Sequence, residues 1–184
     1  MLYNRHVALP QNVEDLKIHE KLFALAGMDG CIGSTDTTDV PMLNCSSWAS
    51  INHIGYKMKQ PARRYNVTVD HSRLILNVTT GFPASWNDKS IVLYDDLVRG
   101  VHDGQLFRDY KFMLLQKGPN GSVQEVNYKG VWFISDNGYL SWTCTQPPLK
   151  KPLTYNDVRY SEWLESMRKD VECTFGILKK DLEF

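Results

Sequence analysis

The chain has 184 residues, with 21 basic and 21 acidic side chains and 42% hydrophobic residues. This length fits one domain, or one domain plus an arm, and the composition excludes wholesale disorder. A net charge of zero argues mildly against a nucleic-acid-binding protein, because such domains usually carry a basic excess.

The cysteines argue against a zinc site. Cys31, Cys45, Cys144 and Cys173 form no C-x-x-C pair, and no histidine lies at ligand spacing from any of them. We find no signal peptide, so we expect reduced, structural thiols in an intracellular protein. No apolar run approaches the roughly 20 residues that a membrane-spanning helix needs.

The first half of the chain predicts a helix followed by strands. A helix begins after Asn12, whose side chain can cap it, and ends at Gly27. A short strand follows at 31–36, and segment 48–56 is ambiguous but compatible with a short helix. Apolar residues then alternate with polar ones on both sides of a tight turn, which predicts a hairpin over 65–78.

The second half predicts two helices separated by further strands. The first helix spans 89–99, and a hairpin over 109–128 turns at a Pro-Asn-Gly tip. The apolar run 131–134 reads as a buried strand, and a long helix with an apolar stripe covers 156–180. A three-strand start with a crossover into a further strand is an α/β pattern.

Three acids stand out by their place on these elements. Asp36 closes the first predicted strand, and Asp136 closes the strand at 131–134. If the two strands are parallel neighbours, both carboxylates emerge at the sheet edge where α/β proteins bind ligands. Glu172 lies on the last helix and can point over this edge. Because Mg²⁺ prefers carboxylate oxygens, the three acids are candidate metal ligands.

Each acid also has a structural interpretation. Asp36 precedes two threonines and could belong to a turn or a cap, and Asp136-Asn137-Gly138 is a good turn sequence. Glu172 on a helix is by default a solvated charge. An unrelated α/β enzyme with purely structural acids therefore stays open on the residues alone.

Four blocks of sequence resemble a known family. GCIGSTDTTDVP, GFPASWNDKSIVLYD, GVWFISDNGYL and VECTFGILKK are similar to successive blocks of the PIF/Harbinger-type transposases, in the plant-transposon-protein subgroup, and the resemblance runs from about residue 24 to the C-terminus. It implies a ribonuclease-H-like fold, in which helices flank a mixed sheet and a hairpin is inserted before the fourth core strand. It further implies a D-D-E triad of Asp36, Asp136 and Glu172, with Mg²⁺ (or Mn²⁺) for DNA strand cleavage and strand transfer.

The resemblance also extends to a fourth acid. Asp88 matches a family aspartate that precedes the first long helix, and the alternative for Asp88 is a helix N-cap. This position makes Asp88 a candidate fourth metal ligand.

Basic and aromatic residues are candidates for DNA contacts. Lys57, Lys59, Arg63 and Arg64 form a basic cluster that could contact phosphates, with a solvated face as the alternative. Trp86 and Trp142 could stack on bases, although burial in the core is the favoured interpretation.

The chain departs from the family pattern at one position and at both ends. Asp39 stands where the family usually has His or Lys, and an extra negative charge there could bind metal or spoil the site. We expect an N-terminal arm and helix over 1–29 and a catalytic core over 30–184, truncated at both ends relative to the family. A separate DNA-binding partner protein would then supply the missing basic parts. We expect the protein to act in the nucleus and to have no membrane partner. The oligomeric state stays open.

Two further alternatives remain within the same fold. One is a catalytically decayed descendant that serves as a DNA- or protein-binding module, which Asp39 and the missing ends favour. The other is a different ribonuclease-H-like nuclease that cuts RNA or hybrids.

Overall fold

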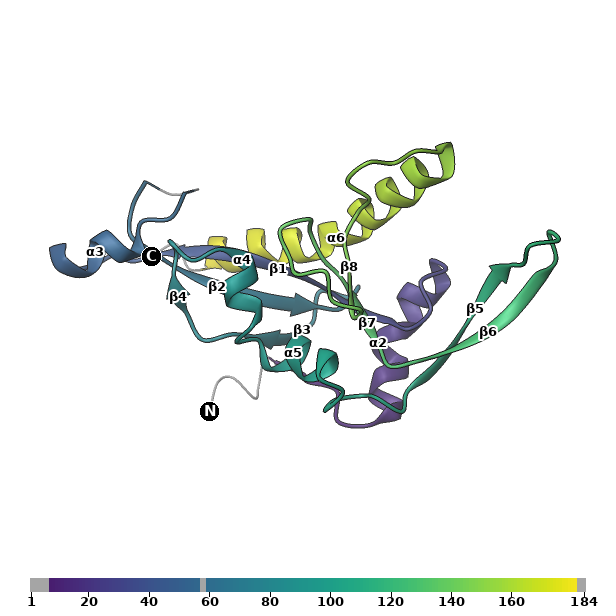
Figure 1. The fold of residues 1–184 in the computed structure, drawn as a ribbon. Coiled ribbons are helices and arrows are strands. Elements are labelled where there is room, and N and C mark those ends of the chain that lie inside the picture. The colour runs from purple at the N-terminus through teal and green to yellow at the C-terminus, as the bar shows by residue number, and fades with distance from the viewer. Residues whose placement is uncertain (1–6, 57–58, 182–184) are drawn as a thin grey trace.

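The computed structural model describes residues 7–56 and 59–181 (Figure 1). Its helices are α2 (Val13–Leu25), α3 (Ser47–His53), α4 (Asp88–Val92), α5 (Asp96–His102) and α6 (Tyr155–Asp181). Its strands are β1 (Cys31–Pro41), β2 (Ala62–Val69), β3 (Ile75–Val78), β4 (Phe82–Pro83), β5 (Lys111–Lys117), β6 (Val123–Lys129), β7 (Trp132–Ile134) and β8 (Thr145–Gln146).

The main sheet is mixed and is built around β1. Its strand order is β3-β2-β1-β7-β8, and β4 pairs with β2. The β1–β2 and β2–β3 pairs are antiparallel, whereas β7 runs parallel to β1 and to β8. Ser34 pairs with Ile134, so Asp36 on β1 is level with Asp136 just beyond the end of β7. The two strands are therefore parallel neighbours, which is the condition on which the expected meeting of Asp36 and Asp136 depends.

Helices cover both faces of this sheet (Figure 1). On one face, Val67 and Val69 of β2 pack with Val171 and Phe175 of α6. On the other face, a larger cluster joins the sheet to α4 and α5, and its members include Ile32, Leu76, Val92, Leu97, Val98 and Phe133. The predicted fold class, a mixed sheet flanked by helices as in ribonuclease-H-like proteins, is confirmed.

Strands β5 and β6 form a separate two-stranded sheet that projects from the body (Figure 1). A hairpin of this kind is marginal alone, so its base must pack on the rest of the chain. Phe112 stacks on Tyr128, with ring centroids 5.7 Å apart, and also packs against the larger core cluster. This is the hairpin predicted before β7.

The single helix predicted over 89–99 is wrong, because Asp95 starts a new helix. The chain turns after α4, and the Asp95 carboxylate caps α5 by accepting a hydrogen bond from Val98 N at 2.8 Å. Asn66 and Asn77 also donate to this carboxylate, which is fully buried. Burial raises the pKa of Asp95, and the hydrogen bonds oppose that shift.

Two other expectations need smaller adjustments. Asp36 does not close its strand, because β1 stays paired with β2 as far as Pro41. Helix α3 overlaps the ambiguous segment 48–56, and the sequence predicts neither β4 nor β8. The remaining elements agree with the sequence within a few residues. In the described part of the chain, no helix combines the length and apolar character needed to cross a membrane.

We expect opposite effects on stability when two glycines are replaced by alanine. A Cβ at Gly33, inside β1, would lie 2.8 Å from the Val69 carbonyl oxygen, and this backbone atom cannot move without shifting β2. Gly33→Ala should therefore lower the free energy of unfolding by about 1–3 kcal/mol. A Cβ at Gly176 on α6 meets nothing within 4 Å, so Gly176→Ala should raise it by up to about 1 kcal/mol. Urea unfolding measures both, and equal effects would contradict the central packing of β1.

Candidate active site

Asp36 lies in the middle of β1 and faces helix α6. Its Oδ2 accepts a hydrogen bond from Nη1 of Arg168 at 2.7 Å, and its Oδ1 accepts one from the Thr37 amide at 2.7 Å. The side chain is only 14% exposed. A carboxylate this shielded requires a charged partner, and Arg168 supplies it.

Arg168 also binds Glu172, one helical turn further along α6. Its Nη2 lies 2.7 Å from Glu172 Oε1 and 3.9 Å from Glu165 Oε2. One guanidinium thus bridges two of the three acids predicted as metal ligands. The Arg168 Nε is buried and has no hydrogen-bond partner.

Asp136 and Asp88 meet at the turn that follows β7. The Gly138 amide donates to Asp136 Oδ1 at 2.6 Å. A Cβ at Gly138 would lie 2.9 Å from that oxygen and 3.2 Å from Asp88 Oδ2, so both carboxylates lie close to this glycine. The Thr37 hydroxyl donates to Asp88 Oδ1 at 2.6 Å and so connects Asp88 to the residue beside Asp36.

The cap of helix α4 separates the two interpretations of Asp88. The Asn87 side chain accepts the Ser90 amide and is the N-cap. Asp88 is therefore the first residue inside the helix, and its carboxylate turns toward Thr37 and Gly138 instead.

Asp39 is neutralised by Arg64. Both residues are only 6% exposed, and Arg64 binds the carboxylate through two nitrogens, Nε at 2.6 Å and Nη2 at 2.8 Å. The hydrogen bond to Asp39 is the main cause of the raised pKa of Arg64. The extra negative charge that departs from the family pattern is therefore already paired.

The predicted basic cluster is divided by the structure. Lys59 and Arg63 are exposed, and Lys57 lies outside the described residues. Arg64 is buried against Asp39, so the prediction of a surface phosphate contact is wrong for this residue. The reason is that its side chain lies on the face of β2 covered by α4, where Nη1 donates to the Trp86 carbonyl at 2.9 Å.

A buried polar network lies beneath the acids. The Tyr139 hydroxyl donates to Asn66 Oδ1, and Asn66 Nδ2 donates to Asp95 Oδ2 at 2.6 Å and to Thr35 Oγ1 at 3.0 Å. Burial, and after it the charge of Asp36, raises the pKa of Tyr139 well above its ordinary value. Tyr139 is therefore a neutral phenol at physiological pH. The network connects the turn after Asp136 to the start of α5.

Sequence reasoning missed Arg168, Asn66 and Tyr139 as parts of this arrangement. Arg168 had a signal, since it lies four residues before Glu172 and so faces the same side of α6. Asn66 interrupts an apolar strand, and Tyr139 follows a turn sequence. Neither pattern indicates a specific partner.

The donor chemistry of these side chains fits a divalent cation. Asp36, Asp88, Asp136 and Glu172 offer the hard oxygens that Mg²⁺ prefers. The Arg168 guanidinium, at 2.7 Å from both Asp36 and Glu172, is a positive group standing between two of them. Within residues 7–56 and 59–181, no three His, Cys, Asp or Glu side chains are already arranged around one metal-sized point. With Arg168 in this position, Glu172 is directed at the guanidinium.

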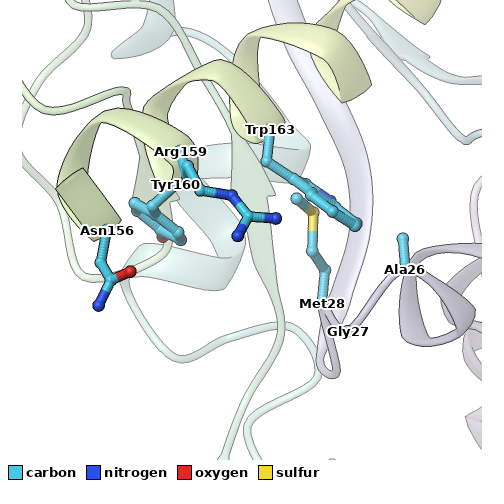
Figure 2. A pocket seen from close by; sticks show the side chains of 7 residues that line it. All are labelled: Ala26, Gly27, Met28, Asn156, Arg159, Tyr160 and Trp163. Atoms are coloured by element: carbon cyan, nitrogen blue, oxygen red, sulfur yellow. The ribbon is translucent and has the colours of Figure 1, made fainter.

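A separate pocket lies between the end of α2 and the first half of α6 (Figure 2). It has a volume of about 280 Å³, and the side chains of Met28, Tyr160 and Trp163 line it with the Arg159 guanidinium between the two aromatic rings. No carboxylate lines this pocket, so it is distinct from the candidate active site.

Comparison with known proteins matches the chain to a family. The sequence model of a family described as DDE superfamily endonuclease matches residues 28–181. No curated protein and no solved structure matches the chain.

We expect the Arg64–Asp39 pair to be essential for stability. Arg64→Met leaves a buried carboxylate without its partner, which should lower the free energy of unfolding by about 3–5 kcal/mol. Arg63→Met is the matched control, because Arg63 is the exposed neighbour on the same strand and should change stability by less than about 0.5 kcal/mol. Chemical denaturation of the two variants measures the difference. Equal stabilities would show that Asp39 does not depend on Arg64.

Proposed function

Because the chain belongs to the DDE superfamily endonucleases, we propose that it is the catalytic core of a PIF/Harbinger-type transposase. As such it would cleave DNA strands and transfer them with Mg²⁺ or Mn²⁺ at Asp36, Asp136 and Glu172. The family is one of nucleases that act on DNA and depend in general on a divalent metal. The subgroup, the strand-transfer step and the three site residues are part of the proposal.

One observation carries this proposal. Asp36 and Asp136 lie at the same level of two parallel strands, and Glu172 reaches the same edge of the sheet through the guanidinium it shares with Asp36. The strand register and the shared guanidinium link acids that are up to 136 positions apart in the chain, and this supports a common site at the edge where α/β sheets bind their ligands.

Each side chain has a distinct role in the proposed site. Asp36 and Asp136 would hold the metal between β1 and the turn after β7. Glu172 is 48% exposed on α6 and can approach from the solvent side, and Asp88 would support Asp136 from the opposite side. When bound, the divalent metal lowers the pKa of the attacking water and stabilises the charge that develops on the phosphate.

Arg168 balances the charge of the acids in the free protein. Its two contacts at 2.7 Å neutralise part of the negative potential that Asp36 and Glu172 would otherwise create. A bound cation would take over this function and compete with the guanidinium for the same oxygens.

The same observation favours a second candidate function. A site in which an arginine already binds two of the acids is also what a catalytically decayed DNA- or protein-binding module would show. Metal binding separates the two, since a decayed site should bind no Mg²⁺.

The proposal includes the surroundings of the site. Lys59 and Arg63 are exposed and remain candidates for phosphate contacts. We also propose an N-terminal arm and helix over 1–29 beside a core over 30–184, nuclear localisation and a separate DNA-binding partner protein. These follow from the resemblance and not from the geometry.

We expect Asp136→Asn to abolish Mg²⁺-dependent nicking of supercoiled plasmid DNA. The loss should be at least about 100-fold, because even an outer partner of a metal ligand can account for up to that factor in affinity or activity. Asp109→Asn is the control, since Asp109 is exposed on the loop before β5. Circular dichroism should show that both variants fold. Unchanged nicking by Asp136→Asn would remove Asp136 from the site.

We expect Arg168→Met to raise the affinity for Mg²⁺, measured by calorimetry. Removing a positive charge bound to two ligands should favour the metal by at least about 1 kcal/mol, or roughly fivefold in Kd. Lys169→Met removes an exposed charge from the next position and should change little. If neither the native chain nor Arg168→Met binds Mg²⁺, the second candidate function replaces the first.

A further inference from the structure

An aromatic cluster lies beside the candidate active site. Phe82 stacks on Trp86, with centroids 5.3 Å apart and planes inclined by 22°, and Tyr94 packs against both rings at 5.4 and 5.8 Å. Trp86 is 36% and Tyr94 56% exposed. The cluster therefore belongs to the surface, and burial of Trp86 in the core, the favoured interpretation of the sequence, is wrong.

Trp142, the other tryptophan considered for base stacking, packs within the protein. Trp86 is therefore the better candidate for contact with a ligand. Trp142 stacks on His102 at 4.3 Å with nearly parallel planes and is packed against the main core cluster. Its environment explains it as a packing residue, as the sequence predicted.

Next to this cluster is a pocket of about 410 Å³ at the start of α4. Its lining contains no charged side chain and consists of Ser85, Trp86, Asn87, Ser90, Leu93 and Tyr94. A neutral, flat ligand suits such a lining, because aromatic faces offer stacking and the serine and asparagine groups offer hydrogen bonds.

The loop that carries Trp86 is held rigidly against the site. Arg64, itself locked by Asp39, donates from Nη1 to the Trp86 carbonyl at 2.9 Å. The Ser85 hydroxyl donates to the Asn52 carbonyl at 2.6 Å. Two residues after Trp86, Asp88 already faces Gly138 and the turn of Asp136. The aromatic cluster and the acids therefore stay at a defined distance from each other.

We propose that this pocket binds an unpaired nucleobase of the DNA substrate, next to the phosphate held at the acids. This inference rests on the proposed function, because the adjacent chemistry is what makes DNA the occupant. The negative edge of the sheet repels phosphate unless a cation is present, whereas the base carries no charge. A nucleotide entering the site is therefore anchored by its base on Trp86 and Tyr94 while its phosphate faces the acids. Stacking of this type tolerates any base, so the pocket positions the strand and does not read its sequence.

The test uses the whole chain and a fluorescently labelled single-stranded oligonucleotide of thymidines, with binding measured by anisotropy. Trp86→Ala should weaken binding by about 5- to 150-fold, the range that one base–aromatic stack accounts for. The Trp86 carbonyl and not its ring holds Arg64, so the substitution keeps that bond. Trp86→Phe preserves stacking and should restore most of the affinity. Tyr94→Ala provides a second variant if Trp86→Ala fails to fold.

Trp163→Ala is the matched control. Trp163 is 46% exposed on α6 and lines the separate pocket of Figure 2, so its loss should leave oligonucleotide binding unchanged. Oligonucleotides with one abasic position add a second criterion. One such position should weaken binding to the native chain and have no further effect on Trp86→Ala. Equal losses for Trp163→Ala and Trp86→Ala, or no sensitive abasic position, would overturn the proposal.

Failure of this inference can be told apart from failure of the proposed function. If Asp136→Asn abolishes nicking while Trp86→Ala binds the oligonucleotide normally, only the pocket inference fails. If the native chain neither nicks DNA nor binds Mg²⁺, yet its oligonucleotide binding depends on Trp86, the nuclease function fails and the base pocket stands.

Discussion

The structure depends on two arginines that neutralise the negative charge of several carboxylates at one end of the sheet. Arg168 joins Asp36 to Glu172 on the α6 side, and Arg64 binds Asp39 on the opposite side. Shielded carboxylates without such partners would carry a desolvation cost of several kcal/mol each. The pairs also explain how a chain of zero net charge can hold several acids at one end of the sheet, since the compensating cations are placed beside them.

Strand β1 distributes these groups to the two faces by its alternation. Asp36 turns toward Arg168 of α6, whereas Thr37 reaches Asp88 on the side of α4. One strand thus supplies a carboxylate to one face and positions a second carboxylate on the other. The long pairing with β2 makes this possible, because it holds β1 extended past Asp36 to Pro41. Asp39, which departs from the family pattern, lies on the same face as Thr37. Arg64 neutralises its charge and also holds the loop of Trp86 and Asp88 in place.

Local sequence predicts most of the helices and strands. It does not predict where a helix is broken. The cap at Asn12, the hairpin tip at 119–121 and the stripe of α6 follow local rules that need no knowledge of the fold. The sequence does not predict the helix break at Asp95, because the residues that cause it are far away along the chain. Asn66 and Asn77 on neighbouring strands donate to this carboxylate, and a helix pattern over 89–99 contains no trace of them. The sequence predicts Arg64 to be a surface cation for the same reason, since only the pairing of β1 with β2 sets it beside Asp39.

The resemblance of four sequence blocks to a family named the candidate acids, and the sequence by itself determined the kinds of element. Local propensity, periodicity and spacing carry that information, because they depend on neighbours within a few positions. Only the tertiary structure decided the partners. Arg168 bridges Asp36 and Glu172, and Asp88 lies against the turn of Asp136. Trp86 is on the surface, whereas Trp142 is half-buried against the core. Such contacts join residues up to 132 positions apart, and their energies depend on burial and charge that exist only once the chain has folded.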